Sequence, residues 1–525
     1  MSAVHARATT PSGHGEVLTQ PAYSTWAELA RANAAAAATW DFDVCGVPVR
    51  ELRSRARAEA IAEARVFSAR MGVPVSSPSE SPELVVMTGH QPQLYHPGIW
   101  VKDFLLQRLA DETGAAALDI VVDSDGFDLV EVRAPCLCPE LSRCAQFLAV
   151  GGTDTCFACA PVPSERDLAI FREAGSQMLA TLPAPAIGRH FSMFCDAMDA
   201  VRQDSGNLGE FITFARRRHE APAGTDYLEL PVTIEARTTA FAVFLADIVR
   251  DATRFAAAYN SELASYRERT GTRSAAQPFP DLRIEGGLVE LPFWNLGKRG
   301  RSTLWARAEG VPALLCDGEV LCELPNECEE VAAALSSCTV RPAPKALALT
   351  LYNRVFVADL FIHGTGGGRY DRVTDGVIRA FWGVEPPAFV VASMTMYLPL
   401  GARVVTVEEV DAVRQTLNRL QHNPDQLLDE IEFDDADEHR RAAVLAGEKS
   451  RLVLEISSPD ADKKTIGRQI RGVNAELAGL MEPYEKSLRE ELARLAEMQQ
   501  ASEILTDRTY PFCFWSPLEV ADKAR

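Results

Sequence analysis

A chain of 525 residues is too long for one hydrophobic core, because single cores stop growing at roughly 250–300 residues, so two or three domains are expected. Hydrophobic residues make up 47% of the chain and charged residues 24%, a globular composition that excludes wholesale disorder. The net charge of −20 repels phosphate backbones and argues against nucleic-acid binding.

The first twenty residues hold no apolar stretch of the kind found in signal peptides. No run of about eighteen apolar residues occurs that could span a membrane. We therefore expect a cytoplasmic protein without a membrane partner. Residues 1–25 are expected to form a disordered tail.

Residues 26–140 are predicted to form N-terminal helices and the first half of a Rossmann-like core. Strong helix formers, including an alanine run at 34–38, dominate the first part. Leu84–Met87 and Leu118–Val122 are short apolar runs typical of buried strands, and Ile99–Leu109 has the apolar spacing of a helix. Strand, helix and strand at this spacing predict a βαβ unit in a parallel sheet.

The alternation of strands and helices stops in residues 141–340, which are predicted to be a large region inserted into the sheet domain. They include helical stretches at Glu165–Leu182 and Thr239–Thr270 and a strand-like segment at Gly287–Phe293. The fold class expected is α/β, with a Rossmann-like parallel-sheet core, this insertion and a C-terminal helical coiled coil.

The α/β rhythm returns in residues 341–425, the predicted second half of the core. Val355–Ile362 and Ala388–Ala392 are expected to be strands. A glycine-rich loop and a helix from about Thr374 to Trp382 connect them, which predicts a second βαβ unit.

Residues 426–505 are predicted to be a helical coiled-coil domain. Its apolar residues alternate at spacings of four and three: Ile466, Ile470, Val473, Leu477, Leu480 and Tyr484. Such a stripe needs a second surface to cover it, so we expect a homodimer through these helices. A helix hairpin that packs on its own chain is the alternative. The aromatic segment 506–525 is expected to dock onto the body.

Five of the twelve cysteines cluster, and the last two of the five form a CxxC pair: Cys136, Cys138, Cys144, Cys156 and Cys159. A zinc ribbon needs a second CxxC at suitable spacing, which this cluster lacks. We expect reduced, partly buried thiols that behave as small hydrophobic residues, and leave a zinc site open.

The loop Thr88–Gly98 leaves the first predicted strand and enters a helix. Ligands of open α/β sheets bind at such places, and a helix N-terminus favours anions. We interpret His90 and His96 as catalytic groups that stabilise negative charge, and Gly89 and Gln91 as substrate-binding residues. Two histidines that hold an irregular loop together are the alternative.

Asp123 and Asp125 follow the second predicted strand, where carboxylates can bind an amine or act as a general base. We assign Asp125 as catalytic and Asp123 as substrate-binding, with turn capping as the alternative. Because the two strands are successive in one βαβ unit, their carboxyl ends meet at one edge. His90, His96 and Asp125 are therefore expected to act on one ligand.

A glycine-rich segment follows the strand predicted at Val355–Ile362. Successive glycines let backbone N–H groups approach a phosphate closely, so the cofactor-binding residues are assigned as Gly364, Gly366, Gly367 and Gly368. Neither the Walker A nor the dinucleotide-binding motif is present, and a mobile loop is the alternative. The neighbouring residues assigned to substrate binding are His363, Tyr370 and Asp371.

Within the inserted region, Glu290, Trp294 and Arg301 bring acidic, aromatic and basic side chains close together in the sequence. This combination suits a small polar zwitterion, so the three are assigned to substrate binding. An ordinary core edge with exposed arginines is an equal alternative.

Four stretches occur in an order that resembles the bacillithiol-synthesis cysteine-adding enzyme family (BshC-like proteins). They are Thr88-Gly-His-Gln91, the strand end Val121-Val-Asp-Ser-Asp125, the segment Phe361–Asp371 and the coiled-coil tail. Family members carry Thr-Gly-Gln-Gln at the first stretch, so this chain looks like a divergent branch. The resemblance implies a Rossmann-like core, a connecting-peptide-like character for the inserted region 141–340 and a dimerising coiled coil. It also implies nucleotide binding and the addition of cysteine to a glucosaminyl-malate acceptor.

We therefore expect a C–N bond-forming ligase that joins an amino acid, cysteine in the first place, to a small sugar-derived or similar acceptor in low-molecular-weight thiol biosynthesis. ATP or ADP is the expected cofactor, and no metal is assigned. Two alternatives stay open. Paired histidines before a helix favour nucleotidyl or adenylyl transfer, and a catalytically silent dimeric protein that binds a small molecule is the other.

Overall fold

The structure is a computed structural model. It describes residues 9–79, 81–137, 141–152, 154–274, 279–297, 300–327, 330–401, 405–431, 433 and 435–525. The chain divides into two compact units. Unit 1 comprises Met1–Cys136, Arg143–Leu398 and Arg508–Arg525, and unit 2 comprises Leu137–Ser142 and Pro399–Asp507.

Unit 1 is built on a mostly parallel sheet, so the prediction of an α/β fold on a parallel sheet is confirmed. In the described residues its strands follow the order β1-β16-β15-β4-β5-β8. Neighbouring strands run parallel except β1, which is antiparallel to β16. The strands are β1 (Glu16–Gln20), β4 (Val85–His90), β5 (Ala116–Val121), β8 (Leu228–Pro231), β15 (Leu360–His363) and β16 (Val390–Thr395).

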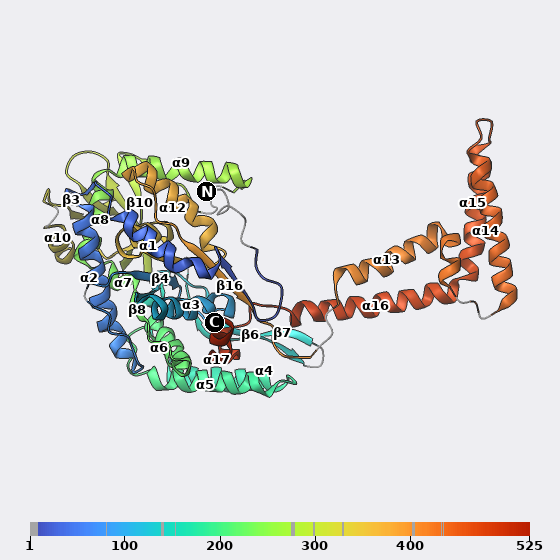
Figure 1. The fold of residues 1–525 in the computed structure, drawn as a ribbon, viewed down its shortest axis with the longest axis horizontal. Coiled ribbons are helices and arrows are strands. Elements are labelled where there is room, and N and C mark those ends of the chain that lie inside the picture. Colours follow the sequence, from blue (N-terminus) through green and yellow to red (C-terminus); the bar gives the residue numbers. More distant parts are fainter. Residues whose placement is uncertain are drawn as a thin grey trace. The chain divides into compact units, whose positions relative to one another are not determined.

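Helices cover both faces of this sheet (Figure 1). Val85 and Met87 on β4 belong to the hydrophobic core that includes α2 (Val49–Ser68). Thr88 points the other way, because its Oγ1 accepts a hydrogen bond from Lys102 of α3 (Pro97–Thr113) at 3.0 Å. The other helices of unit 1 are α1 (Trp26–Ala37), α4 (Glu165–Ala180), α5 (Pro185–Val201), α6 (Leu208–Glu220), α7 (Val232–Glu235), α8 (Thr239–Arg250), α9 (Ala252–Thr270), α10 (Val331–Ser337), α11 (Ala346–Tyr352), α12 (Gly367–Trp382) and α17 (Pro517–Lys523).

A second, antiparallel sheet packs against the same core. Its strand order is β13-β12-β11-β10-β14, with β9 paired to β10. Val289, Leu291 and Phe293 on β10 are buried and belong to the core that contains α2 and α8. The strands are β9 (Ile284–Glu285), β10 (Leu288–Gly297), β11 (Gly300–Arg307), β12 (Ala313–Cys316), β13 (Glu319–Glu323) and β14 (Pro342–Pro344). Two two-stranded sheets complete the strands of the described chain: β2 (Asp43–Val44) pairs with β3 (Val47–Pro48), and β6 (Leu129–Leu137) pairs with β7 (Leu141–Val150).

A buried guanidinium joins the last two strands of the central sheet to two helices. Arg216 on α6 donates to Asp119 on β5 at 3.0 Å and to Glu229 on β8 at 2.7 Å. It also donates to Asp103 on α3 at 2.8 Å and to Glu220 on its own helix at 3.2 Å. Arg216 is 4% exposed, so water cannot replace these bonds. Burial raises the pKa of both Asp103 and Glu229, which eases the crowding of carboxylates around one cation.

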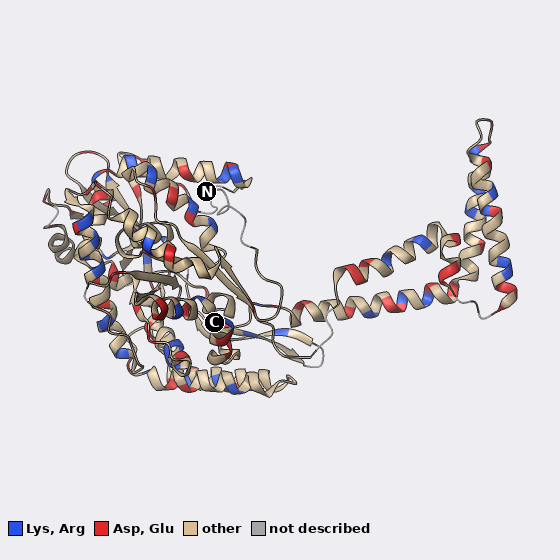
Figure 2. Cartoon of the chain, viewed as in Figure 1, with Lys and Arg blue, Asp and Glu red and all other residues tan. Residues whose placement is uncertain are grey.

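Unit 2 consists of helices whose apolar sides face one another. α13 (Val407–His422) packs against α16 (Glu482–Leu505), and α14 (Ala436–Ile456) packs against α15 (Lys463–Leu480) (Figure 1). Lys, Arg, Asp and Glu residues are spread along all of these helices (Figure 2). Ile466, Val473 and Leu477 of the predicted heptad stripe are buried in a cluster with residues of α13 and α14. The chain therefore covers with its own helices the stripe from which we predicted a dimer.

Several expected element boundaries are wrong. Glu16–Gln20, placed in a disordered tail, is strand β1, because its backbone pairs with the exposed edge of β16; residues 1–8 lie outside the described residues. The region 141–340 is not wholly an insertion, since it supplies β8 to the central sheet. Thr239–Thr270 is two helices that break at Asp251. The strand expected at Val355–Ile362 begins only at Leu360, after a π-helical turn at Asn353–Val357.

Two further expected boundaries differ at helix ends. The expected glycine loop is shorter than predicted, because α12 begins at Gly367 rather than at about Thr374. The heptad stripe does not run along one helix, because α15 ends at Leu480 and α16 starts at Glu482 with a proline in its first turn.

Arg216→Met is expected to lower the free energy of unfolding by about 3–5 kcal/mol, because it leaves buried carboxylates without their cation. Arg218, two residues along the same helix, is exposed, and Arg218→Met should change the free energy by less than about 0.5 kcal/mol. Urea denaturation followed by circular dichroism measures both. Equal urea midpoints for the two variants would show that the Arg216 cluster does not hold the sheet.

Candidate functional site

The carboxyl ends of four parallel strands lie at one edge of the central sheet. Val121 at the end of β5 is paired with His90 on β4 and with Pro231 on β8, and Ile362 on β15 is paired with Thr88. The prediction that β4 and β5 are parallel neighbours is therefore confirmed. Polar residues stand at or just beyond these ends: His363, His90, Gln91, Asp123, Asp125 and Thr233.

A cavity of about 810 Å³ opens at the carboxyl ends of β5 and β8. This volume suits a small molecule, and the position is where open α/β sheets bind ligands. Val121, Asp123, Pro231 and Thr233 line the side toward the sheet. The polar lining residues that sequence analysis did not identify include Arg70, Asn207, Glu210, Arg237, Ser336 and Arg341.

Of the site residues assigned from the sequence, only Asp123 is among the described residues that line this cavity. Its carboxylate accepts hydrogen bonds from the backbone N–H of Thr233, at 3.0 Å, and from the Thr233 hydroxyl. Burial raises the pKa of Asp123 to about 6, against the Thr233 hydrogen bonds, which lower it. A carboxyl group that titrates near neutral pH can accept a proton from a substrate, so Asp123 suits a general base better than the substrate-binding role assigned to it.

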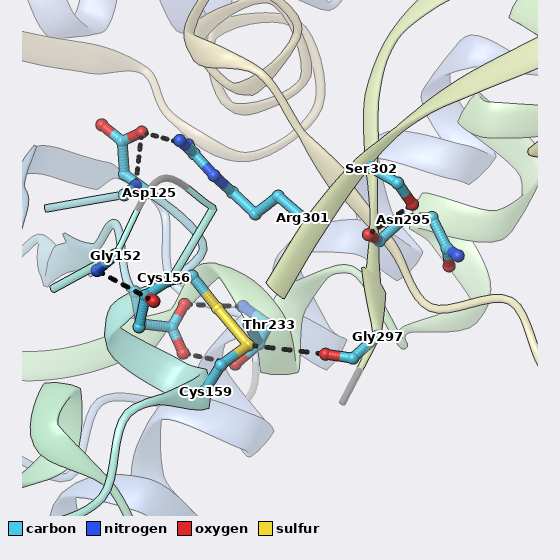
Figure 3. Close-up of a disulfide and its surroundings, with 12 residues drawn as sticks. Asp125, Gly152, Cys156, Cys159, Thr233, Asn295, Gly297, Arg301 and Ser302 are labelled. Carbon is cyan, nitrogen blue, oxygen red and sulfur yellow. Dashed lines mark hydrogen bonds and ion pairs between the residues drawn. A yellow bond between two sulfur atoms is a disulfide. The ribbon is translucent and has the colours of Figure 1, made fainter. Parts of the chain in front are cut away.

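Asp125 is held by residues from two different parts of unit 1. Gln91, just after β4, donates its amide N–H to the carboxylate at 2.8 Å. Arg301 on β11 forms an ion pair with it at 2.8 Å (Figure 3). The Gly126 backbone N–H also donates to Asp125, at 3.0 Å. These three donors fix the Asp125 carboxylate and join it to two other segments of unit 1, which gives Asp125 a positioning role.

The three residues assigned within the inserted region form a connected chain of charged and aromatic contacts. The Arg301 guanidinium stacks over the Trp294 ring at 4.7 Å, and the Lys345 ammonium lies 4.3 Å from the same ring. Lys345 also pairs with Glu290 at 3.0 Å. The structure therefore brings Gln91, Asp125 and this chain together, although they are far apart in the sequence.

His90 is a poor source of positive charge. Its ring packs edge-on against Tyr95 with centroids 5.1 Å apart, and its Nδ1 lies 3.1 Å from the carbonyl oxygen of Gln91. Burial, with the neighbouring Lys102 as a second cause, lowers the pKa of His90 to about 3. The imidazole is neutral at neutral pH, so the expected stabilisation of negative charge by a His90 cation does not fit its surroundings.

His96 and Gly89 have local structural roles. His96 is the N-cap of α3, and its Nδ1 accepts a hydrogen bond from the Gly98 backbone N–H at 3.0 Å. A side chain at Gly89 would meet the carbonyl oxygen of Ile120 at 2.9 Å, so glycine lets β4 lie close to β5. Neither contact involves Asp123 or Asp125.

His363 belongs to a separate buried cluster at the end of β15. Its Nε2 lies 2.9 Å from Asp371, which pairs with Arg354 at 2.6 Å. Burial raises the pKa of Asp371, but Arg354 and His363 outweigh it and hold the pKa below its usual range. Tyr370 lies apart from this cluster, with its ring near Tyr266 and Phe279.

The glycines after β15 have different environments. Gly364 and Gly366 have open space where a Cβ would stand, and none of the four assigned glycines has a positive φ. Gly368 packs α12 against β16, since a Cβ there would come within 2.5 Å of Val391 Cγ2. Gly364, Gly366 and the N-terminus of α12 could hold an anionic group, whereas Gly368 serves packing.

We expected the clustered cysteines to be reduced thiols, and the structure contradicts this expectation. Cys136 is bonded to Cys144, and Cys156 is bonded to Cys159 (Figure 3). Cys138 lies outside the described residues. Among the residues that are described, no group of three or more His, Cys, Asp or Glu side chains could hold a metal ion.

No protein-family model matches this chain, and a search of curated proteins finds no match. None of the helices in the described part of the chain is both long enough and apolar enough to cross a membrane.

A strand missed in the sequence accounts for two of the missed cavity residues. Tyr227-Leu-Glu-Leu-Pro231 is a short, mostly apolar run of the kind found in buried strands, and it includes β8. Reading this run as a strand of the sheet would have placed Thr233 and Arg237 at the same edge as Asp123.

Asp123→Asn is expected to become more stable relative to the wild type as pH rises. Burial raises the pKa of Asp123 in the folded state, so its contribution to stability is present at low pH and is lost as pH rises through about 6. The uncharged asparagine can still accept from the Thr233 backbone N–H through its amide oxygen, and its amide NH2 can donate to the Thr233 hydroxyl oxygen in place of the bond that the carboxylate accepts. The difference in unfolding free energy should change by about 2 kcal/mol between about pH 4 and pH 8. Urea denaturation across this range measures it, with the exposed Asp128→Asn as control. A difference that does not change with pH would contradict the assignment.

Gly300→Ala is expected to destabilise the protein more than Gly310→Ala. Both glycines have positive φ, +120° and +87°, so alanine strains the backbone at each. At Gly300 the new Cβ also meets the carbonyl oxygen of Asp154, which anchors the Arg301 backbone N–H at 2.9 Å, whereas Gly310 faces open space. Thermal unfolding should separate the variants by about 1 kcal/mol or more. Equal losses would show that the Asp154 contact does not position Arg301.

Proposed function

We propose that the chain is an amino-acid-adding enzyme related to the bacillithiol-synthesis cysteine-adding family. It joins an amino acid, cysteine in the first place, to a small polar acceptor on a Rossmann-like core. The observation that carries the proposal is Asp123, a carboxyl group with a pKa of about 6 in the wall of a cavity at the carboxyl edge of the sheet. The resemblance of the four sequence stretches supplies the reaction class.

The cavity offers groups for both parts of such a reaction. Formation of a C–N bond requires an amine nitrogen to lose a proton as it attacks a carboxyl carbon, and the Asp123 carboxylate can take that proton. Arg237 and Arg341 line the same cavity and suit the carboxylate of an amino acid. Gln91 and Arg301 hold Asp125 and so fix the segment that carries Asp123.

ATP or ADP is the cofactor that the resemblance implies. The fitting part of the structure is the segment between β15 and α12, where Gly364 and Gly366 are open and a helix N-terminus follows. These glycines and Gly367 would hold phosphate groups, and a bound nucleotide would supply activation of a carboxyl group. His363 stands at the start of the same segment.

Nucleotidyl transfer, the alternative enzyme class, loses its main support. That reading relies on two histidines that stabilise phosphate charge, but the His90 pKa of about 3 makes the ring neutral and His96 caps α3. A silent binding protein would use the same cavity without turnover, so only an assay of product formation separates it from the proposed enzyme.

A homodimer through the C-terminal helices, with a coiled-coil interface, is part of the proposal by resemblance. The buried Ile466, Val473 and Leu477 already pack on helices of their own chain. A second copy would therefore contact other faces of α13–α16. Exposed apolar residues on α14, Val444 and Leu454, are available for this purpose.

The proposed function predicts that Asp123→Asn binds cysteine but makes little product. Purified protein is incubated with cysteine, ATP and a small-molecule extract of a strain that lacks the gene, and mass spectrometry follows new cysteine-containing products. We expect Asp123→Asn to lose roughly 100-fold or more in product formation, as is typical when a general base is removed. Asp128→Asn, at an exposed position nearby, should retain wild-type activity.

Thermal shifts with cysteine, ATP and ADP accompany the assay. A wild-type shift without any product would support a silent binding protein instead. The absence of both a shift and a product would overturn the proposed function.

A further inference from the structure

The disulfide between Cys156 and Cys159 lies in the wall of the cavity. Cys159 is exposed and lines the cavity, whereas Cys156 is fully buried. The Cys159 sulfur lies 4.0 Å from the carbonyl oxygen of Gly297 on β10 (Figure 3). One sulfur of the pair can thus be reached from the cavity, and the other is shielded by protein.

The backbone of this pair is tied to the acidic segment after β5. The Ala158 N–H donates to the carbonyl oxygen of Asp123 at 2.9 Å, and the Phe157 N–H donates to that of Asp125 at 3.2 Å. Cys156 forms an isolated β-bridge with Gly126. Any rearrangement of residues 156–159 therefore acts on the segment that carries both carboxylates.

We infer that Cys156 and Cys159 are a redox-active pair that exchanges with a low-molecular-weight thiol in the cavity. The thiolate of that small molecule attacks the Cys159 sulfur, a mixed disulfide forms, and Cys156 leaves as a thiolate that takes up a proton. A second molecule of thiol attacks the mixed disulfide. The products are a small-molecule disulfide and two protein thiols, so two thiols are oxidised for one protein disulfide reduced.

The partner is a small thiol rather than a protein because of where the reachable sulfur lies. A cavity of about 810 Å³ accepts a molecule of the size of cysteine or a small peptide. Arg237 and Arg341 line it and favour both the carboxylate of such a molecule and its reactive thiolate. This inference does not depend on the proposed amide chemistry, because it concerns only sulfur.

The second disulfide of the described chain provides an internal comparison. Cys136 and Cys144 connect β6 and β7, and neither is among the residues that line the cavity. Cys144 is half-buried and Cys136 is buried, so this pair also has one more accessible sulfur. If the two disulfides differ in reactivity, the difference therefore reflects the position of Cys159 in the cavity and not its exposure alone.

The test traps the mixed disulfide on the full chain. Reduced Cys156→Ser protein is treated with cystine, and peptide mass spectrometry locates the adducts. Cys159 should carry a cysteine in most molecules, since no second thiol remains to displace it, whereas in the wild type Cys156 displaces the adduct and re-forms the disulfide. Cys159→Ser should carry none at that position. Cys136→Ser, which frees Cys144, should form its adduct about tenfold more slowly.

A second measurement covers the case in which Cys156→Ser does not fold. Wild-type protein is equilibrated with graded ratios of cysteine to cystine, free thiols are alkylated, and both pairs are quantified. The Cys156–Cys159 pair should open at a less reducing ratio than the Cys136–Cys144 pair. Equal opening of the two pairs, or equal adduct formation at Cys144 and Cys159, would overturn the inference. Both experiments measure the masses of peptides from the protein. Their outcome therefore does not depend on whether the protein forms the product of the proposed reaction.

Discussion

The position of the candidate site depends on one buried guanidinium. Arg216 contacts carboxylates on β5, β8, α3 and α6, all of them buried, so the elements around it are joined by charge as well as by apolar packing. Glu229 lies in the middle of β8, and its burial would be costly without a cation beside it. With Arg216 in place, β8 joins the sheet next to β5, and the cavity forms at the carboxyl ends of these two strands.

At this edge of the sheet, two neighbouring carboxylates differ in burial, and we assign them different roles. Asp123 is enclosed and has a raised pKa of about 6, which suits proton transfer near neutral pH. Asp125 is bound by Gln91, Gly126 and Arg301, which hold the same segment in place. The Cys156–Cys159 loop is hydrogen-bonded to the backbone of both residues. Acid–base chemistry and sulfur chemistry would then meet in one cavity and share one short segment of chain.

Sequence patterns predicted the parallel neighbours β4 and β5 and the polar residues at their ends, because apolar runs and their spacing are local properties. The same patterns misjudged the roles of individual residues. His90 and His96 looked like a charged pair, but the protein around His90 removes its positive charge and a helix end uses His96 as a cap. The glycines expected to hold a phosphate have different environments. Gly364 and Gly366 are open, whereas Gly368 is needed for packing because α12 lies close to β16.

By itself, the sequence determined that the chain folds as an α/β protein with a helical C-terminal part, since hydrophobic periodicity alone produces those elements. It also identified Asp123 and Asp125 as residues at a strand end. Only the tertiary structure decided that β8 belongs to the central sheet, that Arg301 reaches Asp125 across 176 residues of chain, and that the heptad stripe is covered within its own chain. Those outcomes depend on burial and on contacts between segments that are distant in the sequence. A short stretch of sequence contains no information about such contacts.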